Sequence, residues 1–396
     1  MGTHADTLLL DLFLIFVAAK LFGELFERLT IPAVLGEILA GVLLGPYATG
    51  LILPSPSVNS IAEIGAVFLL FTVGLEIRPD DLIGVGRKSL WVALAGIAVP
   101  FVLGFFYLRL EGEAAHEATF VAAAMVATSV GITARVLADL HLLNTRVARI
   151  ILGAAVFDDI LGMILLAVVA GLASAAGIQW LHLGITFIEA VGFAIFMIFV
   201  GPRVVRRMRP SLKRMSMQNP PLIFALAICL GLSVAATKIG MAAIIGAFFA
   251  GLAIAEFAPE WNLHPRVGAL NEFLAPFFFF AMGARLNVSV FTARSLLVVS
   301  IVITLLALIS KVVGCGLPVL GEGWRTALRV GVGMTPRGEV ALIVALVGQQ
   351  AGLVSEKGYA IVLFMTVVTT LLAPPVLRWL YRGEVSAQKA LGSSSR

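Results

Sequence analysis

Two adjacent carboxylates occupy an apolar stretch of the chain. The segment VFDDILGMILL, residues 156–166, holds Asp158 and Asp159, and between Val147 and Ala173 the only other charged residue is Arg149. A charge within a membrane-spanning segment is costly and is a candidate functional group. Burial and a neighbouring negative charge both favour the protonated form of a carboxyl group. Such a group can exchange a proton for Na⁺ or a similar hard cation.

Three other charged residues lie in the middle of apolar segments. Lys311 lies in LLALISKVVGCG, residues 305–316, and Arg337 and Glu339 lie in GVGMTPRGEVA, residues 331–341. One lysine cannot pair fully with two adjacent aspartates, because a helix turns their side chains about 100° apart. One aspartate can therefore face Lys311 while the other faces a cavity. The alternative to a functional site is that these charged residues form ion pairs whose only role is to hold helices together.

The composition indicates an integral membrane protein. Hydrophobic residues make up 60% of the 396 residues and charged residues 13%, against about 25% charged in soluble domains. Apolar runs near 20 residues long recur along the chain and match the thickness of a bilayer core. We expect an all-α polytopic protein with about thirteen spans: 7–27, 32–52, 58–77, 89–110, 117–138, 147–174, 183–205, 220–238, 240–256, 267–286, 295–320, 325–350 and 357–381.

The loop charges predict the orientation of the spans. With the N-terminus outside, 20 Lys and Arg fall in inside loops or the C-terminal tail and five in outside loops. The positive-inside rule therefore predicts an outside N-terminus and a cytoplasmic C-terminus. The formal net charge of +5 is explained by these loops and does not indicate a nucleic-acid partner. The tail 383–396 is expected to be a disordered end.

The two halves of the chain resemble each other. VLGEILAGVLLG at 34–45 resembles IIGAFFAGLAIA at 244–255, and AVFLLFTVGLEI at 66–77 resembles APFFFFAMGARL at 275–286. The offsets are 210 and 209 residues, and each match pairs span n with span n+7. Because seven is odd, the copies face opposite ways, which predicts the inverted repeat of secondary transporters.

The repeat also predicts where helices are broken. Thr128, in VATSVGITARV at 126–136, corresponds at an offset of 207 to Thr335, which precedes Pro336. Proline lacks an amide hydrogen and interrupts a helix. Non-helical backbone at membrane depth is tolerated around a cavity or protein interior. We therefore expect two unwound helices that cross close to the aspartates.

The broken segments supply candidate ligands and balancing charges. The hydroxyls of Thr128 and Ser129, with unwound backbone carbonyls, could complete an oxygen shell around a cation. Glu339 falls in the first turn after Pro336, where a carboxylate offsets the positive end of a helix. Arg337 is expected to partner a loop or helix end. For both charged residues, a structural role is favoured over direct ion binding.

Several segments together resemble the bacterial sodium/proton antiporters of the monovalent cation:proton antiporter-2 family, in its NapA-like branch. They are VATSVGITARVL, ILGAAVFDDILGMILLAVV, FLAPFFFFAMGARL, LISKVVG and VGVGMTPRGEVALIVA. The resemblance runs from GEILAGVLLGP at 36–46 to GYAIVLFMTVVTTLLAP at 358–374. It implies a homodimer in the bacterial plasma membrane that exchanges Na⁺ or Li⁺ for H⁺, with no cofactor.

The resemblance also implies roles for residues. Asp159 would carry the ion and the proton, Asp158 would pair with Lys311, and exchange would be electrogenic at two protons per sodium. The chain would form one transporter, with a core domain at roughly 58–175 and 267–381 and a dimer-side domain at roughly 7–52 and 183–256. The core would move like an elevator against the dimer side.

Three other functions remain open on the residues alone. A K⁺/H⁺ exchanger would use the same type of site, although related potassium-efflux proteins usually lack the first aspartate. A gated cation channel would need a filter-like repeat, and a sodium-coupled organic-solute symporter would need a larger polar pocket. An enzyme is not expected, because the five histidines are scattered and lack metal-site spacing such as HExxH.

Overall fold

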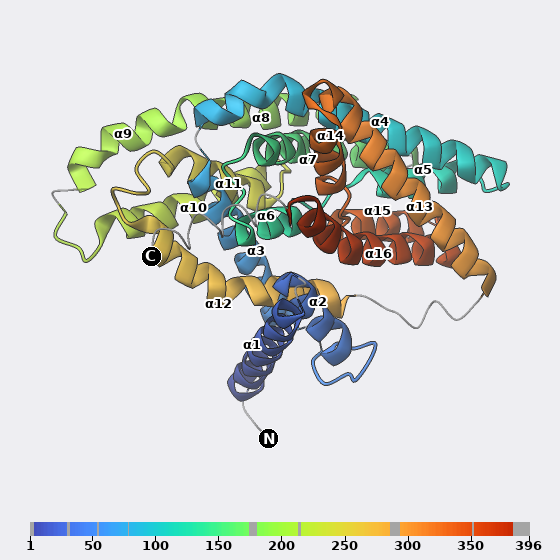
Figure 1. Ribbon diagram of the computed structural model, residues 1–396, viewed down its shortest axis with the longest axis horizontal. Coiled ribbons are helices and arrows are strands. Elements are labelled where there is room, and N and C mark those ends of the chain that lie inside the picture. Colours follow the sequence, from blue (N-terminus) through green and yellow to red (C-terminus); the bar gives the residue numbers. More distant parts are fainter. Residues whose placement is uncertain are drawn as a thin grey trace. The chain divides into compact units, whose positions relative to one another are not determined.

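The computed structural model describes residues 4–29, 32–53, 55–77, 79–173, 180–212, 215–285, 294–350 and 352–382. Within these ranges it consists of helices and turns, without a strand (Figure 1), so the predicted all-α class is confirmed. The tail 383–396 lies outside the described residues. The helices are α1 (His4–Arg28), α2 (Ala33–Leu44), α3 (Pro56–Glu76), α4 (Pro79–Leu110), α5 (Ala115–Val126), α6 (Val130–Asp139), α7 (Arg146–Ala173), α8 (Trp180–Phe199), α9 (Gly201–Leu212), α10 (Pro220–Lys238), α11 (Ala243–Ile254), α12 (Leu263–Ala284), α13 (Arg294–Gly316), the 3₁₀ helix η2 (Leu317–Glu322), α14 (Trp324–Gly333), α15 (Glu339–Gln350) and α16 (Glu356–Leu380).

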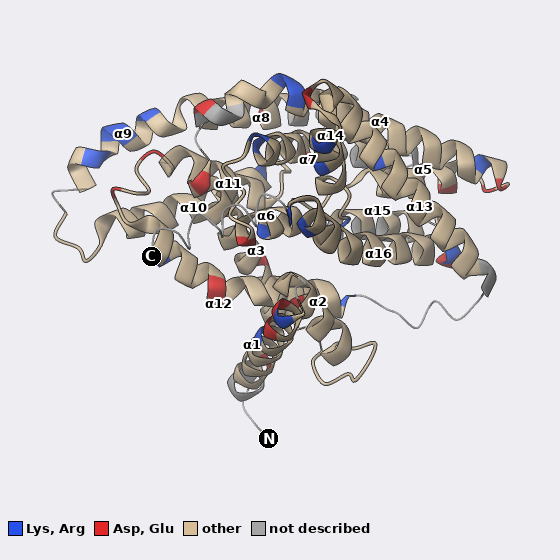
Figure 2. Cartoon of the chain, in the orientation of Figure 1, with Lys and Arg blue, Asp and Glu red and all other residues tan. Residues whose placement is uncertain are grey.

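Many helices have the length and surface of membrane spans. Among the described residues, seven helical segments are long and apolar enough to cross a bilayer, and the pair α8–α9, bent by 47°, makes an eighth. The count of thirteen stays a prediction. Large apolar side chains such as Trp91 and Ile309 are 55% and 59% exposed, and acidic and basic residues occupy only small parts of the helical ribbon (Figure 2). Such a surface is suited to lipid rather than water.

The chain divides into two compact units. Unit 1 comprises Met1–Phe22, Gly36–Gly86 and Asp159–Asn287, and within it α3 packs against both α11 and α12. Unit 2 comprises Gly23–Leu35, Arg87–Asp158 and Val288–Arg396, and within it α13 packs against α14 and α16 while α15 packs against α5. The functional division into core and dimer-side domains stays a prediction.

Two close helix contacts inside unit 1 occur at positions related by the repeat found in the sequence. A Cβ built on Gly41 would lie 2.0 Å from the Phe280 carbonyl oxygen, and one built on Gly251 would lie 2.3 Å from that of Phe71. Gly251 follows Gly41 by 210 residues and Phe280 follows Phe71 by 209, which are the sequence offsets. The same contact therefore occurs twice with the partners exchanged, as two copies related by a twofold axis require.

These glycines permit the close approach of helix backbones. We expect Gly41→Ala and Gly251→Ala each to lower the melting temperature of the protein in detergent, because overpacking costs about 1–3 kcal/mol. Gly231→Ala in α10 is the matched control, since a Cβ there meets no atom within 4 Å and alanine is the better helix former. Equal melting of all three variants would contradict the packing account.

Candidate ion-binding site

Two helices of unit 2 are interrupted where the sequence predicts. Helix α5 ends at Val126 and α6 begins at Val130, while α14 ends at Gly333 and α15 begins at Glu339. Ala127 has extended backbone angles, φ −53° and ψ 135°. Pro336 has no amide hydrogen to continue a helix. Both predicted breaks are thus confirmed, and they lie 207 residues apart in sequence, as Val126 and Gly333 show.

The two breaks meet and satisfy each other's backbone groups. The Ser129 amide donates to the Pro336 carbonyl at 2.7 Å. The Thr128 hydroxyl donates to the Met334 carbonyl at 3.4 Å, and the buried Thr133 hydroxyl donates to the Gly333 carbonyl at 2.6 Å. Unwound backbone inside a membrane needs such partners. The contact between the breaks that the repeat predicts is therefore present.

Lys311 lies beside this crossing and is fully buried. Its ammonium donates to Asp158 Oδ1 at 3.2 Å, to the Gly96 carbonyl at 3.0 Å and to the Val126 carbonyl at 2.8 Å. An ammonium has three N–H donors, so each has an acceptor. Asp158 is 4% exposed. The expected pairing of Lys311 with Asp158 is present, and burial makes it costly to remove either partner alone.

Arg337 contacts the end of a helix, the kind of partner that the sequence predicts for it. Its guanidinium is fully buried and donates to the Ala127 carbonyl at 3.1 Å and to the Ala307 carbonyl at 3.4 Å. Val126 and Ala127 end α5, where unsatisfied carbonyls carry partial negative charge. Lys311 and Arg337 therefore place two cations at the C-terminal end of one half-helix.

The remaining candidates have separate positions. Asp159 follows Asp158 on α7 and is partly exposed. The buried Thr335 hydroxyl, in the break after α14, donates to the Val332 carbonyl near the end of that helix at 2.7 Å. Glu339 is the first residue of α15, as its expected balancing role requires, and its side chain lies outside the described part of the structure.

Some features of the site are not evident from residue type. Thr370 donates to the Arg337 carbonyl at 2.6 Å, although it lies in an unremarkable apolar run. Thr133 lies in the segment that was predicted to contain a helix break, but its hydrogen-bond acceptor, the Gly333 carbonyl, is evident only from the fold. Glu37, in the apolar helix α2, is 1% exposed, and its residue type alone does not predict this burial.

The arrangement suits transfer of a small cation. Carboxylates, hydroxyls and backbone carbonyls are hard oxygen ligands, which suit cations with tightly held hydration shells. A hydroxyl that donates one hydrogen bond, as Thr128 does, still has lone pairs for a cation. The Lys311–Asp158 pair lies immediately beside Asp159 in sequence, so a cation that binds one carboxylate affects the other.

Comparison with known proteins gives consistent matches. Residues 13–383 match the model of a family described as sodium/hydrogen exchanger, transmembrane. The high-affinity Na(+)/H(+) antiporter NhaS3 of Synechocystis is 36% identical, over 95% of this chain and 90% of that protein. The Na(+)/H(+)-K(+) antiporter GerN of Bacillus cereus is 32% identical, over 95% of this chain and 97% of that one.

Solved structures share the fold. The sodium proton antiporter MjNhaP1 from Methanocaldococcus jannaschii at pH 8 matches with a TM-score of 0.67 and 18% identity, over 96% of this chain and 98% of that chain. An electron-microscopy structure of the same antiporter gives a TM-score of 0.70. These matches extend along nearly the whole chain.

Proposed function

The chain belongs to the sodium/hydrogen exchanger family, and from that premise we propose that it is a secondary active Na⁺/H⁺ antiporter with Asp159 as the ion and proton carrier. The observation that carries the proposal is the crossing of two broken helices beside the buried Lys311–Asp158 pair. Broken spans at matching positions of two halves mark the substrate site of transporters.

Competition between proton and cation follows from the chemistry of a carboxylate. Deprotonated Asp159 offers negative oxygens to Na⁺, and protonated Asp159 loses the charge that holds the ion. Thr128, Ser129 and backbone carbonyls of the breaks complete the oxygen shell. A carrier that changes its access only when loaded with either partner exchanges one for the other.

The contacts of Lys311 favour a second proton per cycle. Charged, its ammonium has three donors for Asp158 and two carbonyls. When Na⁺ engages the carboxylates, Asp158 is drawn away from Lys311. A neutral amine keeps two N–H donors, which match the Gly96 and Val126 carbonyls. One proton each from Lys311 and Asp159 per Na⁺ makes the exchange electrogenic.

The wider setting is part of the same proposal. The protein is a multi-pass membrane protein, which we place in the bacterial plasma membrane as a homodimer with its N-terminus outside and its C-terminus in the cytoplasm. Alternating access is by elevator-like movement of the core domain. The placement of basic loops supports this orientation.

Potassium is the second candidate for the transported cation. It is favoured by one observation, that a relative with 32% identity is named for both sodium and potassium. The double aspartate favours sodium. Flux in proteoliposomes with an imposed pH gradient, comparing Na⁺, Li⁺ and K⁺ at several pH values, separates the two. Saturable Na⁺ or Li⁺ exchange is expected. A cation flux that does not depend on the pH gradient would refute antiport.

A further inference from the structure

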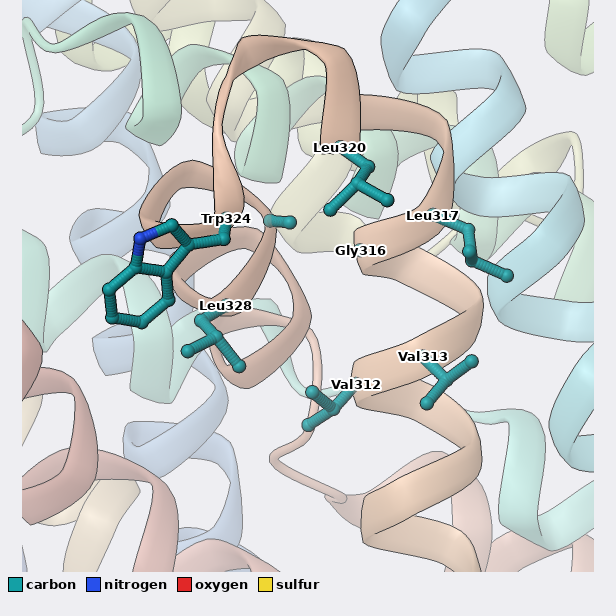
Figure 3. A pocket seen from close by; sticks show the side chains of 8 residues that line it. Val312, Val313, Gly316, Leu317, Leu320, Trp324 and Leu328 are labelled. Atoms are coloured by element: carbon teal, nitrogen blue, oxygen red, sulfur yellow. The ribbon is translucent and has the colours of Figure 1, made fainter.

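An apolar groove lies in unit 2 where α13 passes through η2 into α14. It has a volume of about 360 Å³ and is lined by apolar residues: Val312, Val313, Gly316, Leu317, Leu320, Trp324, Ala327 and Leu328. Figure 3 shows side chains from both arms of this hairpin around the hollow, with the Trp324 ring at one side. The small residues Gly316 and Ala327 leave room between the two helices.

The groove continues an exposed apolar stripe on α13. Leu305, Ile309 and Val313 on α13 and Leu317 at the start of η2 are between 45% and 59% exposed, and the spacing of four residues places the three on α13 along one face of that helix. A stripe of this kind is suited to a long hydrocarbon chain that lies parallel to the helix. The groove is the place where such a chain would be held on more than one side.

Positive charge gathers at the mouth of the groove. The Arg325 guanidinium carbon lies 5.5 Å from the centre of the Trp324 ring, which fixes an exposed cation beside the lining. Glu322, at the end of η2, binds both Lys88 and Arg146, so one carboxylate is outnumbered by two cations. Tryptophan and basic side chains together are typical of the level of lipid headgroups.

We propose that this groove binds one anionic phospholipid. One acyl chain lies in the groove and along the α13 stripe, and the phosphate lies at Arg325 beside Trp324. Charge complementarity selects this occupant, because the lining is apolar and the rim carries a net positive charge. On the predicted orientation the lipid belongs to the cytoplasmic leaflet, where anionic lipids attract basic residues.

The test is lipid binding to the delipidated full-length protein in detergent, counted by native mass spectrometry. The probes are dioleoyl phosphatidylglycerol and dioleoyl phosphatidylcholine. We expect the native protein to bind the first phosphatidylglycerol about fivefold more tightly than phosphatidylcholine, the factor that one basic residue contributes at an anionic surface. Arg325→Gln should remove this preference, whereas Lys238→Gln, which removes an exposed charge from α10, should keep it.

A second pair of variants tests the groove itself. Val313→Trp fills the lining and should weaken binding of both lipids, whereas Val298→Trp, at an exposed position on the same helix outside the groove, should not. Equal affinity for the two lipids in the native protein would overturn the proposal. So would a Val313→Trp protein that binds lipid normally but loses its oligomeric state by light scattering, because the groove would then hold a second copy.

Discussion

Replacing Asp159 by asparagine is expected to abolish exchange. The asparagine side chain has nearly the same shape, but an amide neither titrates nor carries negative charge. Both cation flux and coupled proton movement should therefore fall below about a tenth of the native rates, since the variant removes the group that binds both partners. The measurement is flux in proteoliposomes under an imposed pH gradient.

The folded state should survive this change. Asp159 is partly exposed, so its variant should melt close to the native protein and the loss can be assigned to function. Glu63→Gln is the matched control, because it removes an exposed carboxylate from α3. It should leave exchange intact. Exchange by the Asp159→Asn protein at about a tenth or more of the native rate would exclude Asp159 as the carrier.

Lys311→Gln should change both stability and charge coupling. Without the ammonium, the 4%-exposed Asp158 keeps a buried charge without its cation, a change that typically costs about 3–5 kcal/mol. The Gly96 and Val126 carbonyls also lose a charged donor. We expect a clearly lower melting temperature in detergent, and the double variant Asp158→Asn, Lys311→Gln should recover much of the loss.

Transport by the Lys311→Gln protein separates the two roles of the lysine. If Lys311 supplies one of two protons, residual exchange should become less dependent on membrane potential, which acts at about 2.3 kcal/mol per charge per 100 mV. Currents on a solid-supported membrane, compared with tracer flux, measure this dependence. A variant that stays fully electrogenic and melts like the native protein would reject Lys311 as both partner and proton carrier.

The parts of the site that could be predicted from the sequence are those governed by the free-energy cost of placing charge or unpaired backbone in an apolar medium. A buried ammonium must find an anion, and few charged residues lie in mid-span, so the pairing of Lys311 with one of the two aspartates could be predicted from the residues, and the family resemblance implied that this partner is Asp158. Pro336 and the matching position of Thr128 located both breaks to within a few residues. These features follow from the energetics of charge and backbone in an apolar medium.

Other parts could not be derived from residue types. The carbonyls of Gly96 and Val126 that bind Lys311 are backbone groups, which every residue carries. Thr133 and Thr370 look like ordinary hydroxyls of apolar helices, and such hydroxyls often bond only to their own helix. The burial of Glu37 could not be predicted, because position along a span does not give the direction of a side chain. The number of spans is difficult to count because α2 and α11 have only 12 residues each.

Competition between Na⁺ and protons at Asp159 is tested most directly by proton release on sodium binding. Purified protein in weakly buffered detergent solution receives NaCl, with choline chloride as the ionic-strength control, and the released protons are counted. The native protein should release protons on addition of Na⁺ and not of choline, and the Asp159→Asn protein should release far fewer. Sodium binding without proton release, or equal release by the Asp159→Asn protein, would contradict the account.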